Sequence, residues 1–559
     1  MRLLLTFGHA TRRRGGAGPR RIGAVSLFVV GVLSSASGAR ALAAQSCVTH
    51  TGEHALGHLA GLRIDSILIE TSPPRPLRGI DRAMRLVHAQ TRASTIRRLI
   101  TVVANSPVDT LQLAESLRAL RRARFLADAS LDASECRERA SVRLTFRTLD
   151  AWSTRSSVRV ASARSAASLE ELNLLGTGRS AKVSLRSDAG QLGVGMQYVD
   201  PWALGTRLGL AVSRNAFRAG SEWSAALRTA PRSVFDAWRG ELLVANSRRF
   251  SVASRNDVVV RSGAALFVER RAMITPSAVT SVVFGAELQR ASLAAGSTSV
   301  LIGPATVSRR FAALDIGATR RSVSYRTAAG LLGSERTVEL PSGYESDVLL
   351  GFGRDIATGS PMQHIDAWAG KLWFAPHHAI VSTNVWASGY RSRGEWSAGD
   401  ARVSLLAIQP VKRGQWLLRG SAETLLDPDP DVRALSAIDP TARLFAARGL
   451  AETATVLSLE RDVHLREIGA SYMLDAAIFG LGSRRWDAAS ASAPEASAGV
   501  GVLGVGLRLS PLRIARATIR FDVGWPVLRS PGISKRPMIG IGISPWLETE
   551  RRRAARPPT

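Results

Sequence analysis

The sequence lacks the features that define several common classes of protein. Only two cysteines occur among its 559 residues, which excludes a disulfide-stapled small domain and a zinc ribbon. The mean hydropathy of +0.04 excludes a polytopic helical membrane protein, which would be far more apolar. It leaves a transmembrane β-barrel open, because strands that alternate apolar and polar residues average to a neutral value. A chain of this length predicts two or more domains, or one large barrel.

Lysine is nearly absent, although the formal net charge is +29. Only four of the 74 basic residues are lysines, and the arginines are spread along the whole chain. A nucleic-acid-binding protein would gather its basic residues in a patch, an arm or one helix face. The distribution therefore indicates an arginine-biased composition and predicts no nucleic-acid partner.

Motifs for catalysis and for metal or cofactor binding are also missing. The pairs His54/His58 and His377-His378 have no carboxylate or cysteine cluster beside them. Gly176-Thr177-Gly178 and Gly351-Phe352-Gly353 are too short for a phosphate loop, and no Lys-Ser/Thr follows either. We therefore predict no enzyme, no catalytic residue, no metal and no cofactor. A hydrolase that assembles its residues from distant strands stays open as an alternative, without particular residues to assign to it.

The first forty residues have the pattern of an export signal. Arg12-Arg13-Arg14 and Arg20-Arg21 precede an apolar run from Ile22 to Leu33, and Ala41-Leu42-Ala43 supplies an A-x-A cleavage pattern. This arrangement predicts a secretory signal peptide at residues 1–43. A retained membrane anchor is the alternative, although the run is too short to span a bilayer comfortably.

Export to an oxidising periplasm bears on the two cysteines of the chain. Cys47 and Cys136 would be the only thiols of the mature protein, and such compartments favour disulfides. We predict a disulfide between them, with two unpaired thiols as the alternative.

Residues 61–150 have the periodicity of a small α/β unit. The stretches 62–70 and 141–147 alternate and predict strands, whereas 91–103 and 109–125 carry leucine and isoleucine at helical spacing. A further short strand is expected near 124–131. The unit is too small for an enzyme active site and long enough for a docking module.

Beyond about residue 170 the helical period gives way to alternation. Examples are the stretches 192–198, 519–525 and 539–544, in which one face is apolar and the other glycine, polar or charged. Alternation alone does not separate a soluble sandwich from a membrane barrel. The export signal, the many such segments and the absence of internal repeats favour an all-β transmembrane antiparallel barrel. Residues 179–547 have room for sixteen strands of about ten membrane-embedded residues each.

Five short motifs follow one another along this second region. They are Glu-Leu-Asn-Leu-Leu-Gly-Thr-Gly-Arg at 171–179, Tyr-Val-Asp-Pro-Trp at 198–202, Phe-Ala-Ala-Arg-Gly-Leu at 445–450, Leu-Glu-Arg at 459–461 and Met-Leu-Asp-Ala-Ala at 473–477. In this order they resemble the entry turn, strand end, lumen loop and two following strands of the BamA/TamA-like outer-membrane assembly family, also called the bacterial surface antigen family.

The resemblance implies a division of the chain and a set of site residues. It implies a periplasmic POTRA-like domain at 44–150, a linker at 151–170, a barrel at 171–547 and a basic, disordered tail at 548–559. Asn173, Gly176 and Gly178 would form the barrel entry turn. Arg448, followed by Gly449 in the lumen loop, would pair with Asp475, with Glu460 nearby, because a guanidinium inside a barrel needs a carboxylate partner.

The resemblance also implies a seam and a function. The first and last strands, near Ala181–Arg186 and Met538–Ser544, would meet at a seam that Gly540 and Gly542 weaken, and Trp546 would close the last strand. The protein would insert other barrels into the outer membrane of a Gram-negative type bacterium, or move polypeptides across it. Its partners would be unfolded outer-membrane polypeptides, outer-membrane lipids and, as a further expectation, periplasmic chaperones or accessory subunits. A two-partner-secretion translocator and a passive pore or structural surface antigen are the alternatives.

Overall fold

A computed structural model describes most of the chain from Cys47 to Pro545. The described residues are 47–51, 57–74, 88–136, 141–161, 164–188, 191–217, 220–230, 233–250, 258–275, 277–294, 308–328, 338–356, 358–392, 394–426, 453–468, 472–486, 497–511, 517–530 and 535–545. The predicted signal peptide at 1–43 and the predicted tail at 548–559 lie outside them.

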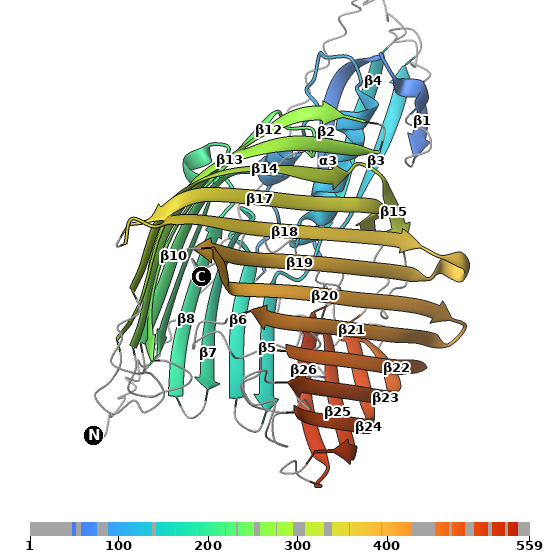
Figure 1. Ribbon diagram of the computed structural model, residues 1–559. Helices are drawn as coiled ribbons and strands as arrows, with labels where there is room; N and C mark the ends of the chain where they lie inside the picture. The colour runs from blue at the N-terminus through green and yellow to red at the C-terminus, as the bar shows by residue number, and fades with distance from the viewer. Residues whose placement is uncertain are drawn as a thin grey trace, which may run out of the picture. The chain divides into compact units, whose positions relative to one another are not determined.

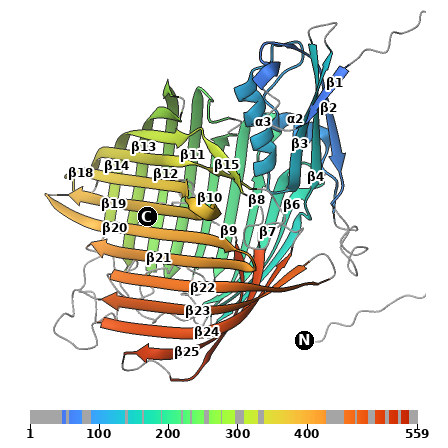
Figure 2. The ribbon, with the colours of Figure 1, turned by 90° about the vertical axis from the view of Figure 1, so that its right-hand side faces the viewer.

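The first described part is a small α/β domain with a four-stranded sheet. Its elements are β1 (Cys47–Thr51), the 3-10 turn η2 (Gly57–Leu59), β2 (Arg63–Ser72), α2 (Ala93–Leu99), α3 (Thr110–Arg122), β3 (Leu126–Cys136) and β4 (Ser141–Asp150). The strand order is β1-β3-β4-β2, in which β2 runs parallel to β4 and the other pairs are antiparallel. Figure 2 shows both helices on one face of this sheet.

The sequence explains where these elements begin and what holds them together. Asp109 caps α3, because its carboxylate accepts hydrogen bonds from the backbone N–H groups of Leu111 and Gln112. Leucines at helical spacing then face the sheet, and they pack in a core with β-strand side chains such as Leu144 and Phe146. The predicted helices and strands of this region are confirmed within a few residues, and β1 is an additional edge strand that the sequence analysis did not predict.

The second part is one large antiparallel sheet (Figure 1). Its strands are β5 (Thr154–Ala161), β6 (Arg164–Leu174), β7 (Arg179–Asp188), β8 (Gln191–Asp200), β9 (Leu208–Phe217), β10 (Gly220–Thr229), β11 (Trp238–Phe250), β12 (Val258–Ile274), β13 (Ala278–Ala294), β14 (Ser308–Ser322), β17 (Gly343–Asp355), β18 (Pro361–Phe374), β19 (Ile380–Ser392), β20 (Glu395–Val411), β21 (Gly414–Leu426), β22 (Thr453–Ile468), β23 (Tyr472–Trp486), β24 (Ser497–Pro511), β25 (Ala517–Arg529) and β26 (Met538–Pro545).

Every strand of this sheet pairs with its neighbours in chain order, and the order is circular because β26 pairs with β5. The connection from β14 to β17 carries a separate hairpin of β15 (Tyr325–Ala328) and β16 (Val338–Pro341). Short 3-10 turns, η4 (Ala203–Gly205) and η6 (Pro376–His378), lie in the β8–β9 and β18–β19 connections.

Two predictions about this sheet need correction. Among the described residues the circular order contains twenty strands, not sixteen. The segment 151–170, predicted as a linker, contains β5 and most of β6, and the predicted barrel start at residue 171 falls inside β6. The serine- and alanine-rich sequence of this segment carries little apolar alternation, so it has a weak strand signal. These two strands form because β6 pairs with β7 and β5 pairs with β26, which provides the hydrogen-bond partners that stabilise a strand of weak local preference.

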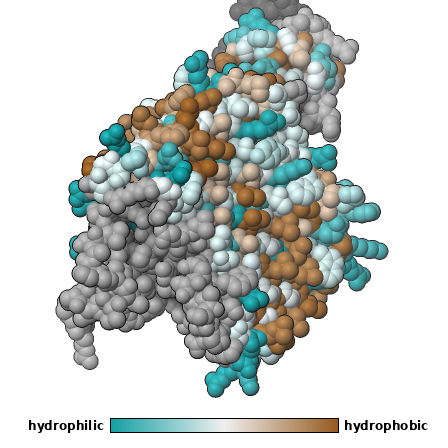
Figure 3. Space-filling model, viewed as in Figure 1, coloured by the Kyte–Doolittle hydropathy of each residue, from teal (hydrophilic) through white to brown (hydrophobic). Residues whose placement is uncertain are grey.

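The two faces of the large sheet differ in polarity, and their exposure is the reverse of that in a soluble sandwich. On β25 the apolar Ile519, Phe521 and Trp525 are exposed, whereas Arg520 and Asp522 are buried. On β8 the apolar Leu192 and Met196 are likewise exposed. Figure 3 shows hydrophobic side chains gathered in two areas of the visible surface, with pale and hydrophilic ones between them and hydrophilic ones projecting at the edges. The outward face is therefore apolar and the inward face is polar.

No helix within the described residues has both the length and the apolar character that a membrane span requires.

Candidate functional site

The predicted entry turn between β6 and β7 has the backbone that its glycines suggest. Leu175, Gly176 and Gly178 all have positive φ angles, of 54°, 73° and 72°. The Asn173 side chain holds the turn, because its Oδ1 accepts a hydrogen bond from the Gly178 N–H at 2.8 Å. Glycine avoids the steric cost that other residues meet in this conformation, so two glycines in this short segment favour the turn.

The same turn docks on the small domain, at the N-terminal end of α2. Asn173 donates through Nδ2 to Thr91 Oγ1 at 2.8 Å. The Gly176 carbonyl accepts hydrogen bonds from Arg92 N–H and Thr95 Oγ1, both at 3.0 Å. All three predicted residues thus lie at the junction between the small domain and the large sheet, which is a role that the sequence analysis did not assign to them.

Replacing Gly176 by alanine should loosen this junction. A Cβ at this position would lie 2.2 Å from the Gln90 carbonyl oxygen, and a positive φ costs an L-residue about 1–2 kcal/mol. We expect faster amide hydrogen exchange across residues 90–98 and a lower unfolding temperature.

The matched control for this variant is Gly359→Ala. Gly359 also has a positive φ, of 68°, but a Cβ there has nothing within 4 Å. Equal effects of the two substitutions on exchange at residues 90–98 would contradict the proposed role of the close approach.

Helix α3 makes a second contact, with two of the connections between strands of the large sheet. The buried Glu115 accepts a hydrogen bond from the Val234 N–H at 2.9 Å and forms an ion pair with Arg118. Arg118 and Arg121 both pair with Glu339 of β16. The Arg118 guanidinium also stacks over the Tyr325 ring of β15, 3.9 Å from its centroid. The β15–β16 hairpin and α3 therefore form one contact that combines ion pairs with cation–π stacking.

The predicted lumen residue Glu460 lies at the centre of a buried ion cluster on β21–β25. Arg508 Nε and Arg520 Nη2 each approach a Glu460 oxygen at 2.8 Å, and Arg419 Nη1 approaches at 3.3 Å. Asp522 pairs with both Arg508 and Arg520. All of these side chains except the half-buried Arg419 are buried, and they come from four strands, so they tie the inner face of this part of the sheet together.

Asp475, the other predicted carboxylate, lies beside the same cluster. It is opposite Arg508 in the β23–β24 register and opposite His464 in the β22–β23 register, and its Oδ1 lies 3.2 Å from His464 Nδ1. The predicted partner Arg448 and its neighbour Gly449 lie outside the described residues, so their pairing with Asp475 stays a prediction.

The sequence analysis missed Arg419, Arg508 and Arg520, the three arginines that pair with Glu460. A signal for two of the missed residues was present. Arg520 and Asp522 occupy the inward positions of an alternating strand whose outward positions are apolar, and Arg508 lies opposite Arg520 in the next strand. Charged residues on the inward face of neighbouring strands need each other as partners. Arg419 carries no comparable signal, because it follows the apolar run Trp416-Leu417-Leu418, which does not alternate.

The predicted seam involves a different first strand from the one expected. Residues 181–186 belong to β7, which pairs with β6 and β8. The partner of β26 is β5, and that pairing is recorded at one residue pair, Ile541 with Val160. By contrast, all eight residues of β26 pair with β25. The correction follows from the two additional strands before residue 175, which displace β7 from the end of the sheet.

The glycines predicted to weaken the seam have a second consequence. Gly540 lies opposite Asp522 and Gly542 opposite Arg520 in the β25–β26 register. Because glycine has no side chain, these two positions of β26 place nothing beside Asp522 and Arg520. Trp546 lies outside the described residues.

The two cysteines are placed as neighbours by the backbone. Cys47 of β1 lies directly opposite Cys136 of β3 in the antiparallel register. This register is compatible with the predicted disulfide, which stays a prediction.

Together these observations define the structural class of the protein. It has a large antiparallel sheet with an apolar outer face and a charged inner face, and a small α/β domain that precedes the sheet and docks on it. No family model matches the chain, and no curated protein matches it. Among solved structures it is similar to CdiB from Escherichia coli, with 12% identity, coverage of 89% of this chain and 80% of that one, and a TM-score of 0.45.

Two further solved structures are similar over most of the chain. CdiB from Acinetobacter baumannii has 11% identity, covers 89% of this chain and 77% of that one, and has a TM-score of 0.39. BamA from Haemophilus ducreyi lacking POTRA domains 1–3 has 13% identity. The match covers 86% of this chain and 85% of that one, with a TM-score of 0.35.

Proposed function

We propose that this protein is an outer-membrane β-barrel that assembles polypeptide clients into the membrane or translocates them across it, with residues 44–150 acting as a periplasmic POTRA-like docking domain. The observation that carries the membrane assignment is the outward apolar and inward charged polarity of the large sheet. Fully burying one Leu, Ile or Phe side chain is worth about 1.5–3 kcal/mol. Dozens of exposed apolar side chains are therefore favourable in hydrocarbon and costly in water.

The client-docking role rests on an open edge in the small domain. Strand β2 is at the edge of its sheet, and its central residues 66–70 pair only with β4 among the described residues. The ends of this edge are already occupied: Ile64 exchanges backbone hydrogen bonds with residues 105–106, and Gln90 Nε2 donates to the Thr71 carbonyl. An extended client could add a strand to the free central segment by β-augmentation.

The lateral-opening role rests on the junction between β5 and β26. One recorded residue pair joins these strands, so far fewer hydrogen bonds hold this seam than hold the neighbouring strand pairs. A seam of this kind is where a barrel would open toward the membrane at the lowest cost in free energy.

The lumen loop adds a means of holding the barrel wall in one state. Glu460, Asp462, Asp475 and Asp522 face the guanidinium groups of Arg419, Arg508 and Arg520 on β21–β25. Asp475 has its ion pair with His464 and not with one of these arginines, so a further guanidinium entering the lumen would find a carboxylate partner there. Arg448 in the resemblance-predicted loop would supply that group, next to Asp475.

A disulfide across the seam tests lateral opening. The register supports Val160→Cys with Ile541→Cys as the seam staple. The matched control is Val160→Cys with Ser165→Cys, which joins β5 to β6 within one hairpin. We expect the seam staple to abolish client handling under oxidising conditions and to restore it on reduction, whereas the control staple leaves it intact. Unimpaired client handling with the oxidised seam staple would show that lateral opening is wrong.

Depletion of the protein, followed by proteomics of the outer-membrane and secreted fractions, identifies the client class. A fall in several outer-membrane barrels supports assembly, and loss of one large secreted polypeptide supports the translocator form of the proposal. Unchanged fractions together with single-channel conductance would overturn client handling and favour a passive pore.

A further inference from the structure

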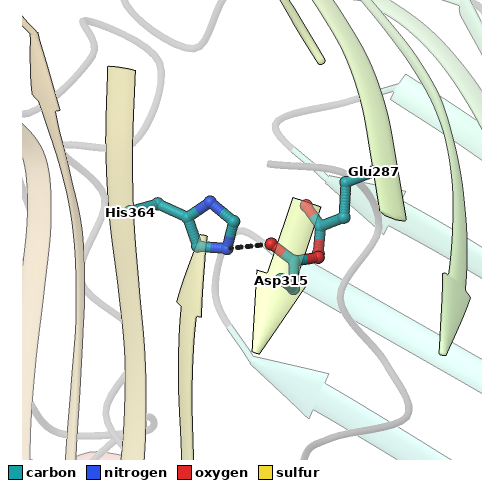
Figure 4. A group of neighbouring side chains, drawn as sticks. All are labelled: Glu287, Asp315 and His364. Atoms are coloured by element: carbon teal, nitrogen blue, oxygen red, sulfur yellow. Dashed lines mark ion pairs between the residues drawn. The ribbon is translucent and has the colours of Figure 1, made fainter. Parts of the chain in front are cut away.

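Three potential metal ligands meet on the inner face of the large sheet, away from the junction, the seam and the ion cluster. They are Glu287 of β13, Asp315 of β14 and His364 of β18, and one ligand atom from each lies within 4.8 Å of the others. Figure 4 shows the Asp315 carboxylate between the His364 ring and the Glu287 carboxylate. The three residues are far apart in the sequence, so a search for neighbouring ligands does not find them.

The strand register places two of the three ligands, Asp315 and His364, in a single row across the sheet, and Glu287 lies two residues along β13 from that row. Gly285, Asp315, Gly351 and His364 are successive partners on β13, β14, β17 and β18. Gly351 makes the central space: a Cβ there would lie 1.9 Å from His364 Cε1 and 2.5 Å from Asp315 Oδ1. The glycine between the two ligands is therefore what lets the imidazole reach the carboxylate.

Asp315 is the observation that points to a ligand. It is only 4% exposed, and neither of its carboxylate oxygens has a hydrogen-bond donor among the described residues. Oδ1 has an ion-pair contact with His364 Nε2 at 3.3 Å, but no hydrogen bond from the described residues offsets the desolvation cost of the buried carboxylate, and a second carboxylate nearby increases that cost. A bound cation removes both costs, because it replaces the missing donors and separates the like charges.

The surroundings fix the other ligands in place. Gln289 Nε2 donates to Glu287 Oε2 at 2.7 Å, which orients that carboxylate. The His364 ring packs beside Phe311 and Tyr390, with ring centroids 6.2 and 5.6 Å away. Such outer contacts hold ligating side chains in position and limit water access.

We propose that Glu287, Asp315 and His364 bind a divalent transition-metal ion, with Zn²⁺ as the best fit to the donor set. One imidazole and two carboxylates are ligands that Zn²⁺ accepts, with an open fourth position. Tetrahedral zinc ligands at their usual bond lengths stand about 3.4 Å apart, and His364 Nε2 lies 3.3 Å from Asp315 Oδ1. The ion would join β13, β14 and β18 and stabilise this part of the wall.

The binding test uses the full-length chain without a histidine tag, purified in detergent micelles and stripped with EDTA. Equilibrium dialysis against Zn²⁺, followed by elemental analysis, should give one zinc per chain. Asp315→Asn and His364→Ala should each weaken zinc binding by more than about 100-fold, since even outer-shell partners are worth 10–100-fold. Less than stoichiometric zinc in the wild type, or wild-type affinity in Asp315→Asn, would overturn the proposal.

Two controls separate loss of the site from loss of the fold. His377→Ala with His378→Ala removes adjacent turn histidines that could bind metal adventitiously, and it should retain one zinc per chain. Gly351→Ala keeps all three ligands but fills the space between them, so Zn²⁺ should raise the unfolding temperature of the wild type and not of this variant. Gly482→Ala, where a Cβ meets nothing within 4 Å, should keep the zinc-dependent shift. A zinc-dependent shift in Gly351→Ala equal to that of the wild type would contradict the assigned position.

Discussion

Replacing Ile316 by arginine should destabilise the folded protein in a lipid bilayer by about 2–4 kcal/mol, the cost of a basic side chain on the lipid face near the midplane. Ile316 is at the middle of β14, is 49% exposed and points outward. Its register partners on both sides, Phe284 and Leu350, are also exposed and apolar. The guanidinium would therefore have only hydrocarbon around it.

Leu528→Arg is the matched control for this substitution. Leu528 is 72% exposed but lies next to the end of β25, where a basic side chain reaches the interface and costs about 0–1 kcal/mol. The measurement is reversible unfolding in lipid vesicles, followed by the fluorescence of the twelve tryptophans. Equal costs at the two positions would show that the outer face of β14 does not contact hydrocarbon.

Replacing Glu460 by glutamine should cost about 3–5 kcal/mol, because removal of one member of a buried ion pair leaves the remaining charge uncompensated. Glu460 is 3% exposed and has three guanidinium partners at 3.3 Å or less. Asp522 would remain as the carboxylate partner of Arg508 and Arg520, and Arg419 would lose its Glu460 contact. The same unfolding measurement in vesicles gives the loss.

The control for Glu460 is Glu241→Gln, which removes an ion pair of similar length from a more open place. Glu241 lies 2.7 Å from Arg228, and both side chains are partly exposed. Pairs of this kind contribute about 0–1 kcal/mol. If Glu460→Gln costs no more than Glu241→Gln, the cluster on β21–β25 does not stabilise the wall in the way inferred here.

The small domain could be predicted from the sequence because its signals are local. Leucines at helical spacing follow a capping aspartate at Asp109, and the alternation at 141–147 marks a strand with one buried face. The polarity of the large sheet could also be predicted as an alternation. The alternation alone did not decide which face would be exposed, because the same pattern fits a sandwich whose apolar face is inside; the export signal and the number of such segments favoured the barrel.

The strand count and the first strand of the seam could not be predicted, because pairing partners decide them. Residues 154–174 have little apolar alternation, yet they form two strands once β7 and β26 provide edges to pair with. The resemblance to a known family placed Glu460 and Asp475 in the lumen, and the structure gave them strand arginines and a histidine as partners. Arg448 remains the predicted additional partner.

The sequence by itself determined the class of each segment: few cysteines and lysines, an export pattern, one small α/β unit and a long alternating region. Only the tertiary structure decided which side chains meet. The register across neighbouring strands brings Glu287, Asp315 and His364 together and surrounds Glu460 with arginines. The physical reason is that alternation fixes which face a side chain occupies, whereas its neighbours on that face depend on pairings between distant strands.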